Sequence, residues 1–243
     1  MGQTVALIPA HNEVLTVRKV VEKTMPHVDR VIVIDDGSDD GTTESLTGSG
    51  AEVIRHASNL GKGSRLVEGL DFAFSQGADF VITLDADQQH DPDDIPDFVA
   101  MFETNATALV LGDRSEDMKQ MPKSRRRGIK FGNFFIGWGC GCRIKDAQCG
   151  MRLYPATMWK KVRIPTKDTK KFKFETAALL YAAKAGVQFE YVPIAARYEG
   201  FILRPSHFDP VRDFLRLFGL VTMFLVRRGF HLKGLLLMLG IAR

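Results

Sequence analysis

The chain has 243 residues, of which 45% are hydrophobic and 26% are charged, and its formal net charge is +4. This is ordinary globular composition, which excludes a disordered chain and suits one large α/β domain or two small ones. A modest excess of basic residues does not by itself separate a nucleic-acid partner from other anionic partners.

The first half of the chain alternates short apolar runs with segments whose apolar residues recur at helical spacing. Strands separated by helices predict an α/β protein with a Rossmann-like, doubly wound and mostly parallel sheet. The predicted strands are residues 5–9, 30–34, 52–55, 80–84 and 108–112, and the predicted helices span about 14–21, 64–74 and 91–102.

The second half is less regular. Its predicted elements are a polar, basic connection over 113–130, a helix over 130–138, a glycine-rich turn at 137–141, a helix over 174–185 and a strand over 188–192. Acidic residues concentrate in the first half and basic residues in the second. That distribution suits a metal ion with a phosphorylated ligand at one end and an anionic partner at the other.

The three cysteines lie close together, at Cys140, Cys142 and Cys149. Their odd number and spacing predict neither a disulfide framework nor a zinc site. We expect reduced, buried thiols, which favours a cytoplasmic location. The N-terminus lacks the basic and apolar regions of a signal peptide. The longest uncharged run of the apolar C-terminal region, Leu217–Val226, has about half the length that spans a bilayer.

Polar motifs follow the predicted strands, where doubly wound sheets bind their ligands. Asp85 and Asp87 follow the fourth strand, and carboxylates at i and i+2 of a turn can hold Mg²⁺ or Mn²⁺, which bridges diphosphate oxygens. Gln89 adds a carbonyl oxygen. The alternative is that such aspartates only cap helices, and we assign Asp91 to that role.

Two further strand ends carry polar residues. Asp36 follows the second strand, where its carboxylate can accept hydrogen bonds from a base or ribose; the alternative is a solvated acidic turn. His11 and Glu13 follow the first strand, where an imidazole can stack on a base and a carboxylate can bond to it. Lys62, between two glycines near a helix start, forms a weak phosphate site without the spacing of a Walker loop.

Together, the motifs at residues 9–13, 34–42, 59–63 and 84–92 resemble those of the family 2 glycosyltransferases. The most similar members are the dolichyl- and polyprenyl-phosphate sugar synthases, and the resemblance covers about residues 4–200. It implies a GT-A catalytic domain at 1–200, an amphipathic helical tail at 201–243, and inverting transfer from a GDP- or UDP-hexose.

The resemblance also assigns donor-side residues. It implies Mg²⁺ or Mn²⁺ as the cofactor, with a metal ion among Asp85, Asp87 and Gln89. The donor set that follows from the motifs is Pro9, His11, Glu13, Ile34 and Asp36 at the nucleoside, and Lys62, Asp85, Ala86, Asp87 and Arg204 near the diphosphate. Arg204 belongs to this set because residues 200–208 replace the family's usual Gly-x-Ser-Lys, and Arg204 would take the place of that lysine near the diphosphate.

On the acceptor side, Arg114 follows Gly112 as in the family's Gly-Ser-Arg, whose arginine meets phosphate. Arg125 precedes Asn133 by eight residues, which implies a second guanidinium at the acceptor phosphate. The family's serine is Ile129 here, so the acceptor contact is altered. Asp146 opens a segment similar to the family's Asp-x-x-Ser/Cys-Gly-Phe/Met-Arg. The predicted catalytic residues are therefore Asp87, Asp146, Arg114 and Arg125.

The identity of the acceptor stays open. A lipid phosphate would attack as an anion without a general base, whereas an alcohol on a lipid or glycan would need one, for which Asp146 is the candidate. The tail at 211–243 alternates apolar blocks with basic residues. This pattern is typical of a peripheral helix on the cytoplasmic face of a membrane, although a core-packing helix or an oligomer contact fits it as well.

Other function classes fit less well. A nucleotidyltransferase would carry a glycine-rich, basic loop after the first strand, which residues 10–12 do not form. A non-catalytic nucleotide-sugar-binding subunit would not need Asp85, Asp87 and Gln89 intact. The sequence also lacks the RRM or helix-turn-helix pattern that would indicate nucleic-acid binding. The sequence does not indicate an oligomeric state.

Overall fold

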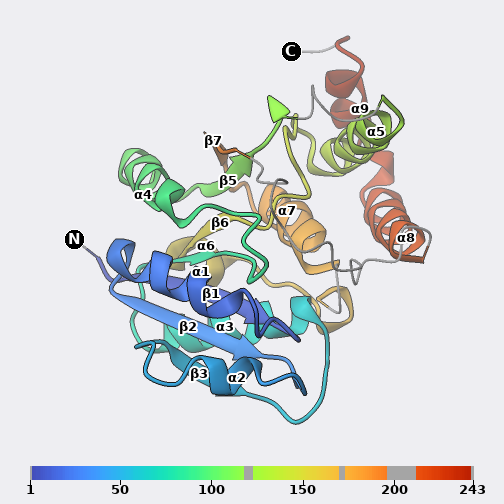
Figure 1. Cartoon of the computed structure of the whole chain (residues 1–243). Helices are drawn as coiled ribbons and strands as arrows, with labels where there is room; N and C mark the ends of the chain where they lie inside the picture. The colour runs from blue at the N-terminus through green and yellow to red at the C-terminus, as the bar shows by residue number, and fades with distance from the viewer. Residues whose placement is uncertain (1, 118–122, 170–172, 196–211, 242–243) are drawn as a thin grey trace.

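The computed structural model describes residues 2–117, 123–169, 173–195 and 212–241. These residues form a seven-stranded sheet in the order β3-β2-β1-β4-β6-β5-β7, with helices on both faces (Figure 1). The strands are β1 Thr4–Ala10, β2 Arg30–Asp35, β3 Glu52–Arg55, β4 Phe80–Thr83, β5 Leu109–Asp113, β6 Arg152–Pro155 and β7 Phe189–Pro193.

All pairings are parallel except those of β6, which runs antiparallel to both β4 and β5. The sequence pattern did not predict β6, because four residues beginning with a buried arginine show no strand period. Pairing of Thr83 with Arg152 places the segment before β6 beside the carboxyl end of β4. This strand therefore brings residues 146–151 next to Asp85.

Helices cover both faces of the sheet because side chains along each strand alternate between them. Val5 and Leu7 face a core shared with α3, α5, α7 and α8, whereas Ala6 and Ile8 face one shared with α1 and α4. The helices are α1 Val17–Thr24, α2 Thr42–Ser45, α3 Lys62–Ser75, α4 Ile95–Thr104, α5 Lys123–Cys140, α6 Ala156–Lys161, α7 Phe174–Lys184, α8 Arg212–Arg227 and α9 Leu232–Met238, with short 3-10 turns at Met25–His27, Pro92–Asp94, Thr166–Asp168 and Gly229–His231.

Two predictions for the second half were wrong. Residues 123–130, predicted to be a connection, form the first turns of α5, and the predicted glycine-rich turn at 137–141 is helical through Cys140. Its glycines serve close packing instead. A Cβ on Gly137 would lie 2.9 Å from Sδ of Met238, and one on Gly139 would lie 2.6 Å from Cδ2 of Leu180. Only Gly141, with φ of +76°, ends the helix as a turn residue.

Other local predictions were confirmed. The five strands expected in the first half are present within a few residues of their predicted bounds. Asp91 caps a short 3-10 turn, since its side chain accepts a hydrogen bond from the amide of Asp93. All three cysteines are free; Cys140 and Cys149 are buried, and Cys142 is half-buried.

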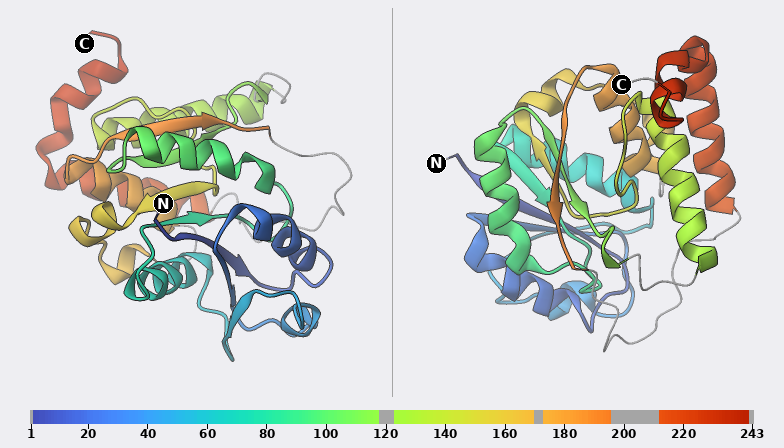
Figure 2. Two further views of the ribbon diagram at one scale, coloured as in Figure 1. Left: turned by 90° about the vertical axis from the view of Figure 1, so that its left-hand side faces the viewer. Right: turned by 90° about the horizontal axis from the view of Figure 1, so that it is seen from above.

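Helix α8, the first helix of the tail, packs beside α5 and α7 (Figure 2). Its buried side consists of Leu220, Val221, Phe224 and Leu225, which belong to the same core as α3. Among the described residues, no helix has both the length and the hydropathy that a membrane span requires. The core-packing alternative for the tail is thus correct for one side of α8.

Candidate functional site

The carboxyl ends of β1, β2 and β4 meet at one edge of the sheet, because these strands are parallel and adjacent. Asp85 and Asp87 follow β4 at this edge. The turn closes through Gln88, which adopts a left-handed conformation with φ of +65°. The amide of Gln89 then donates to Oδ1 of Asp87 over 3.0 Å. Local geometry therefore keeps the predicted metal-binding residues on one compact turn.

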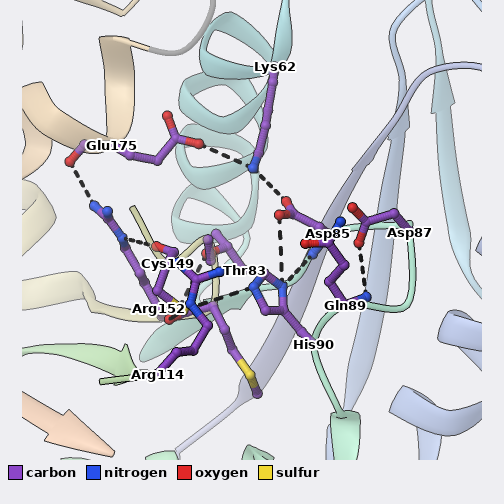
Figure 3. Close-up of polar contacts among 12 residues, drawn as sticks. Lys62, Thr83, Asp85, Asp87, Gln89, His90, Arg114, Cys149, Arg152 and Glu175 are labelled. Carbon is purple, nitrogen blue, oxygen red and sulfur yellow. Dashed lines mark hydrogen bonds and ion pairs between the residues drawn. The ribbon is translucent and has the colours of Figure 1, made fainter. Parts of the chain in front are cut away.

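Lys62 reaches into this site from the first turn of α3 (Figure 3). Its Nζ lies 2.5 Å from Oδ1 of Asp85 and 3.2 Å from Oε1 of Glu175, at the start of α7. The sequence predicted Lys62 as a phosphate contact, but in this structure its ammonium joins two carboxylates. The sequence did not predict Glu175 as a site residue, because an acidic residue in the first turn of a helix has an ordinary role there.

His90 fixes the backbone of the same turn. The amide of Asp85 donates to Nδ1 of His90 over 3.1 Å, and Nε2 of His90 lies 3.9 Å from Sγ of Cys149. Burial lowers the pKa of His90 to about 4, so its ring is neutral near pH 7. A neutral ring that accepts at Nδ1 carries its proton on Nε2, which faces the thiol.

The two aspartates differ in their electrostatics. Burial alone would raise the pKa of Asp85, but the charge of Lys62 outweighs it and the pKa falls to about 2. Burial and the charge of Asp85 raise the pKa of Asp87 to about 6. Asp85 is therefore ionised throughout the neutral pH range. The ionised form of Asp87 is less stable than that of Asp85, because its environment favours the protonated carboxyl.

The donor set fits a metal ion that is shared with a ligand. Asp85 and Asp87 offer the hard oxygen atoms that Mg²⁺ and Mn²⁺ prefer, and the exposed Gln89 follows on the same turn. Among the described residues, no group of three or more His, Cys, Asp or Glu side chains is arranged to hold a metal ion. Two carboxylates without an all-protein cage suit a cation whose remaining ligands come from phosphate and water.

Residues 146–150 form the wall opposite Asp85, and Arg152 holds them there. Its fully buried guanidinium donates to the carbonyl oxygens of Ala147, Cys149 and Glu175 over 2.7–2.8 Å. Gly150 closes the wall, since a Cβ there would lie 2.7 Å from Oδ2 of Asp85. No larger residue fits between this loop and the aspartate.

Two of the predicted acceptor-side residues bind each other. Nε of Arg114 lies 2.7 Å from Oδ2 of Asp146, and its Nη2 lies 3.2 Å from Oδ1. The amide of Gln148 also donates to Oδ1 over 3.0 Å, so both oxygens of the buried Asp146 are occupied. Asn133 anchors the same loop through the carbonyl of Lys145 and the amide of Ala147.

Two predicted residues fall partly or wholly outside the described structure. Arg204 lies beyond the described residues. Arg125 lies in α5, where only its backbone is described. The predicted roles of these two guanidinium groups therefore stay predictions.

The predicted nucleoside residues lie at the ends of β1 and β2. Pro9 ends β1 with Ala10, and His11 and Glu13 lie half-buried in the following turn. That turn is joined to the one after β2, because the amide of Glu13 donates to Oγ1 of Thr42 over 2.8 Å. The structure thus brings these residues to the same edge as Asp85, because β1 pairs with both β2 and β4. Ala86 is buried within the aspartate turn.

Two nucleoside candidates have structural roles in this structure. The side chain of Ile34 is fully buried in the core beneath α3. The carboxylate of Asp36 accepts hydrogen bonds from the amides of Leu60 and Gly61 over 2.8 and 2.7 Å, and from Nε of Arg65 over 2.7 Å. Asp36 therefore fixes the loop from which Lys62 extends.

The chain is similar to several known proteins. The sequence model of Glycosyl transferase family 2 matches residues 5–181. The UDP-N-acetylglucosamine–dolichyl-phosphate N-acetylglucosaminyltransferase of Methanococcus voltae is 29% identical, covering 79% of this chain and 84% of its own length. The undecaprenyl-phosphate mannosyltransferase of Micrococcus luteus is 26% identical, with 79% and 80% covered.

A solved structure confirms the predicted GT-A fold. The crystal structure of glucosyl-3-phosphoglycerate synthase from Mycobacterium tuberculosis, in complex with Mn²⁺, UDP and phosphoglyceric acid, matches with a TM-score of 0.64. The match covers 93% of this chain and 78% of that chain, at 19% sequence identity. At this level of identity the likeness concerns the arrangement of strands and helices.

We expect Arg152→Met to lower the free energy of unfolding by about 2–4 kcal/mol, because two buried and one part-buried carbonyl oxygen lose their arginine donor. Urea unfolding followed by circular dichroism measures the change. Arg163→Met, at an exposed arginine, is the control and should change stability by less than about 0.5 kcal/mol. Equal effects of the two substitutions would show that Arg152 does not hold the loop.

Proposed function

The chain belongs to glycosyl transferase family 2, and from this premise we propose that it is a metal-dependent hexosyltransferase with a lipid-phosphate acceptor. It takes a hexose from a GDP or UDP sugar and joins it to a polyprenyl or dolichyl phosphate, with inversion at the anomeric carbon. The observation that carries the proposal is the aspartate turn after β4, which lies opposite the wall of residues 146–150, where Asp146 binds Arg114. Relatives named for dolichyl and undecaprenyl phosphate support the acceptor class.

The donor half of the reaction takes place at the ends of β1, β2 and β4. Asp85 and Asp87 would hold Mg²⁺ or Mn²⁺, which would supply positive charge to the departing nucleoside diphosphate. His90 keeps the backbone of Asp85 in place, and Gly150 keeps the facing wall close. The turn after β1, with His11 and Glu13, lies where the nucleoside would bind.

The pairing of Arg114 with Asp146 favours a phosphate acceptor over an alcohol. Asp146 has both oxygens occupied by Arg114 and the amide of Gln148, so it is not poised to remove a proton from an alcohol. Its role is to orient the guanidinium of Arg114, a group suited to binding phosphate. A phosphate is already an anion near neutral pH and attacks without a general base.

The exposed side of α8 supports contact with a membrane, where an isoprenoid acceptor would be presented. Leu215 and Val226 are exposed and lie on the side of the helix opposite the buried Phe224, whereas Phe218 stacks on Phe135 of α5. The exposed Arg216 and Arg227 lie beside this apolar stripe. An apolar stripe with basic margins is typical of helices in the interface of anionic membranes.

A panel of donors and acceptors tests the proposed reaction. We expect glycosyl polyprenyl phosphate, detected by mass spectrometry, when the enzyme is incubated with Mn²⁺, polyprenyl phosphate and the correct member of a set of UDP and GDP sugars. Polyprenol and a soluble glycan serve as alcohol acceptors in parallel. Product with an alcohol and none with the phosphate would replace the proposed acceptor by the alternative one.

Asp87→Ala should lower the rate of sugar transfer by at least about 100-fold, because the metal loses one of its two carboxylate ligands. The fold should be retained, as judged by circular dichroism. Asp97→Ala, at an exposed residue in the first turn of α4, is the matched control and should keep nearly full activity. Substantial activity of Asp87→Ala with saturating Mn²⁺ would contradict the assignment.

Leu215→Glu should reduce binding to vesicles of phosphatidylcholine and phosphatidylglycerol by about tenfold, since it removes apolar contact and adds a repelled charge. Sedimentation of the protein with vesicles measures the change. Leu15→Glu is the control, because Leu15 is 60% exposed and Leu215 is 61% exposed. If both variants bind like the unmodified protein, α8 does not provide the membrane contact.

A further inference from the structure

Lys62 occupies an unusual position for a lysine in a diphosphate site, since it contacts acidic groups on both sides. Its side chain is 24% exposed, and those of Asp85 and Glu175 are 28% and 13% exposed. The three groups come from α3, the turn after β4 and the start of α7 (Figure 3). A cation at their centre therefore joins three separate elements of the fold.

The carboxylates keep this lysine charged. Nζ of Lys62 lies within ion-pair distance of both Asp85 and Glu175, so two negative charges stabilise its positive charge. The ammonium is 2.5 Å from the same carboxylate that the proposed function gives to the metal. Two cations that share one carboxylate repel each other strongly in a partly buried site.

Glu175 offers Lys62 a second place to bind. Its Oε1 already lies 3.2 Å from Nζ of Lys62. Its Oε2 is buried and accepts no hydrogen bond within the part of the chain that the structure describes. A buried carboxylate oxygen without a donor is costly, so Glu175 gains if the ammonium moves toward it.

We propose that Lys62 is a positioning residue that acts as a resident cation, neutralising Asp85 in the unloaded site and shifting to Glu175 when a divalent ion arrives. This inference rests on the proposed function, from which it takes the metal role of Asp85. Because Lys62 opposes binding of the bare ion, the metal binds well only together with the anionic diphosphate. The aspartate turn is thus kept ordered and charge-balanced between turnovers.

Titration of Mn²⁺ without nucleotide tests this role, with free Mn²⁺ measured by electron paramagnetic resonance. Lys62→Met should bind Mn²⁺ on the order of tenfold more tightly than the unmodified protein, because a competing charge is gone. Lys62→Arg retains the charge and should bind weakly, as the unmodified protein does. Lys145→Met removes a different lysine, paired with Asp113, and should leave Mn²⁺ binding unchanged.

Unchanged or weaker Mn²⁺ binding by folded Lys62→Met, or no binding by either protein, would overturn the inference. Glu175→Gln gives a second test that does not depend on how Lys62→Met folds. It should weaken Mn²⁺ binding several-fold, because Lys62 then stays on Asp85, and unchanged binding would also count against the inference. If the unmodified protein does not transfer sugar, the proposed function is wrong. The Mn²⁺ titration still decides the role of Lys62, because it does not measure transfer.

Discussion

The buried guanidinium of Arg152 is the interaction on which the site depends. It is fully buried and donates to carbonyl oxygens of Ala147, Cys149 and Glu175. A guanidinium offers its donors in a rigid planar fork, and buried carbonyl groups without donors are costly. The loop before β6 and the start of α7 are therefore positioned together. The loop brings Gly150 against Asp85, and α7 brings Glu175 to Lys62.

Charge balance explains the arrangement around that centre. Asp85 and Glu175 share Lys62, whereas Asp36 is paired with Arg65 of the same helix, α3. The two pairs are linked, because Asp36 also binds the amide of Gly61, the residue before Lys62. A buried carboxylate is tolerated only when paired and hydrogen-bonded. The buried ion pair of Asp36 and Arg65 thus fixes the backbone before Lys62, the cation of the other pair.

Helix α8 combines two interpretations that the sequence left as alternatives. Its buried side joins the core through Leu220, Val221 and Phe224. Its exposed side, with Leu215 and Val226 among its residues, is available for the proposed membrane contact. Period and charge alone cannot tell which apolar side of a helix meets the protein, because that depends on the neighbouring helices α5 and α7.

The sequence by itself determined the features that arise from short-range physics. Apolar runs, turn residues and the carboxylates after the fourth strand predicted five strands, a mostly parallel sheet and the position of the aspartate turn. Only the tertiary structure decided which distant residues meet there. Strand β6, the helical glycines of α5 and the pairing of Lys62 with Glu175 depend on contacts between segments far apart in the chain. Local patterns do not encode such contacts, because they exist only once the helices have packed on the sheet.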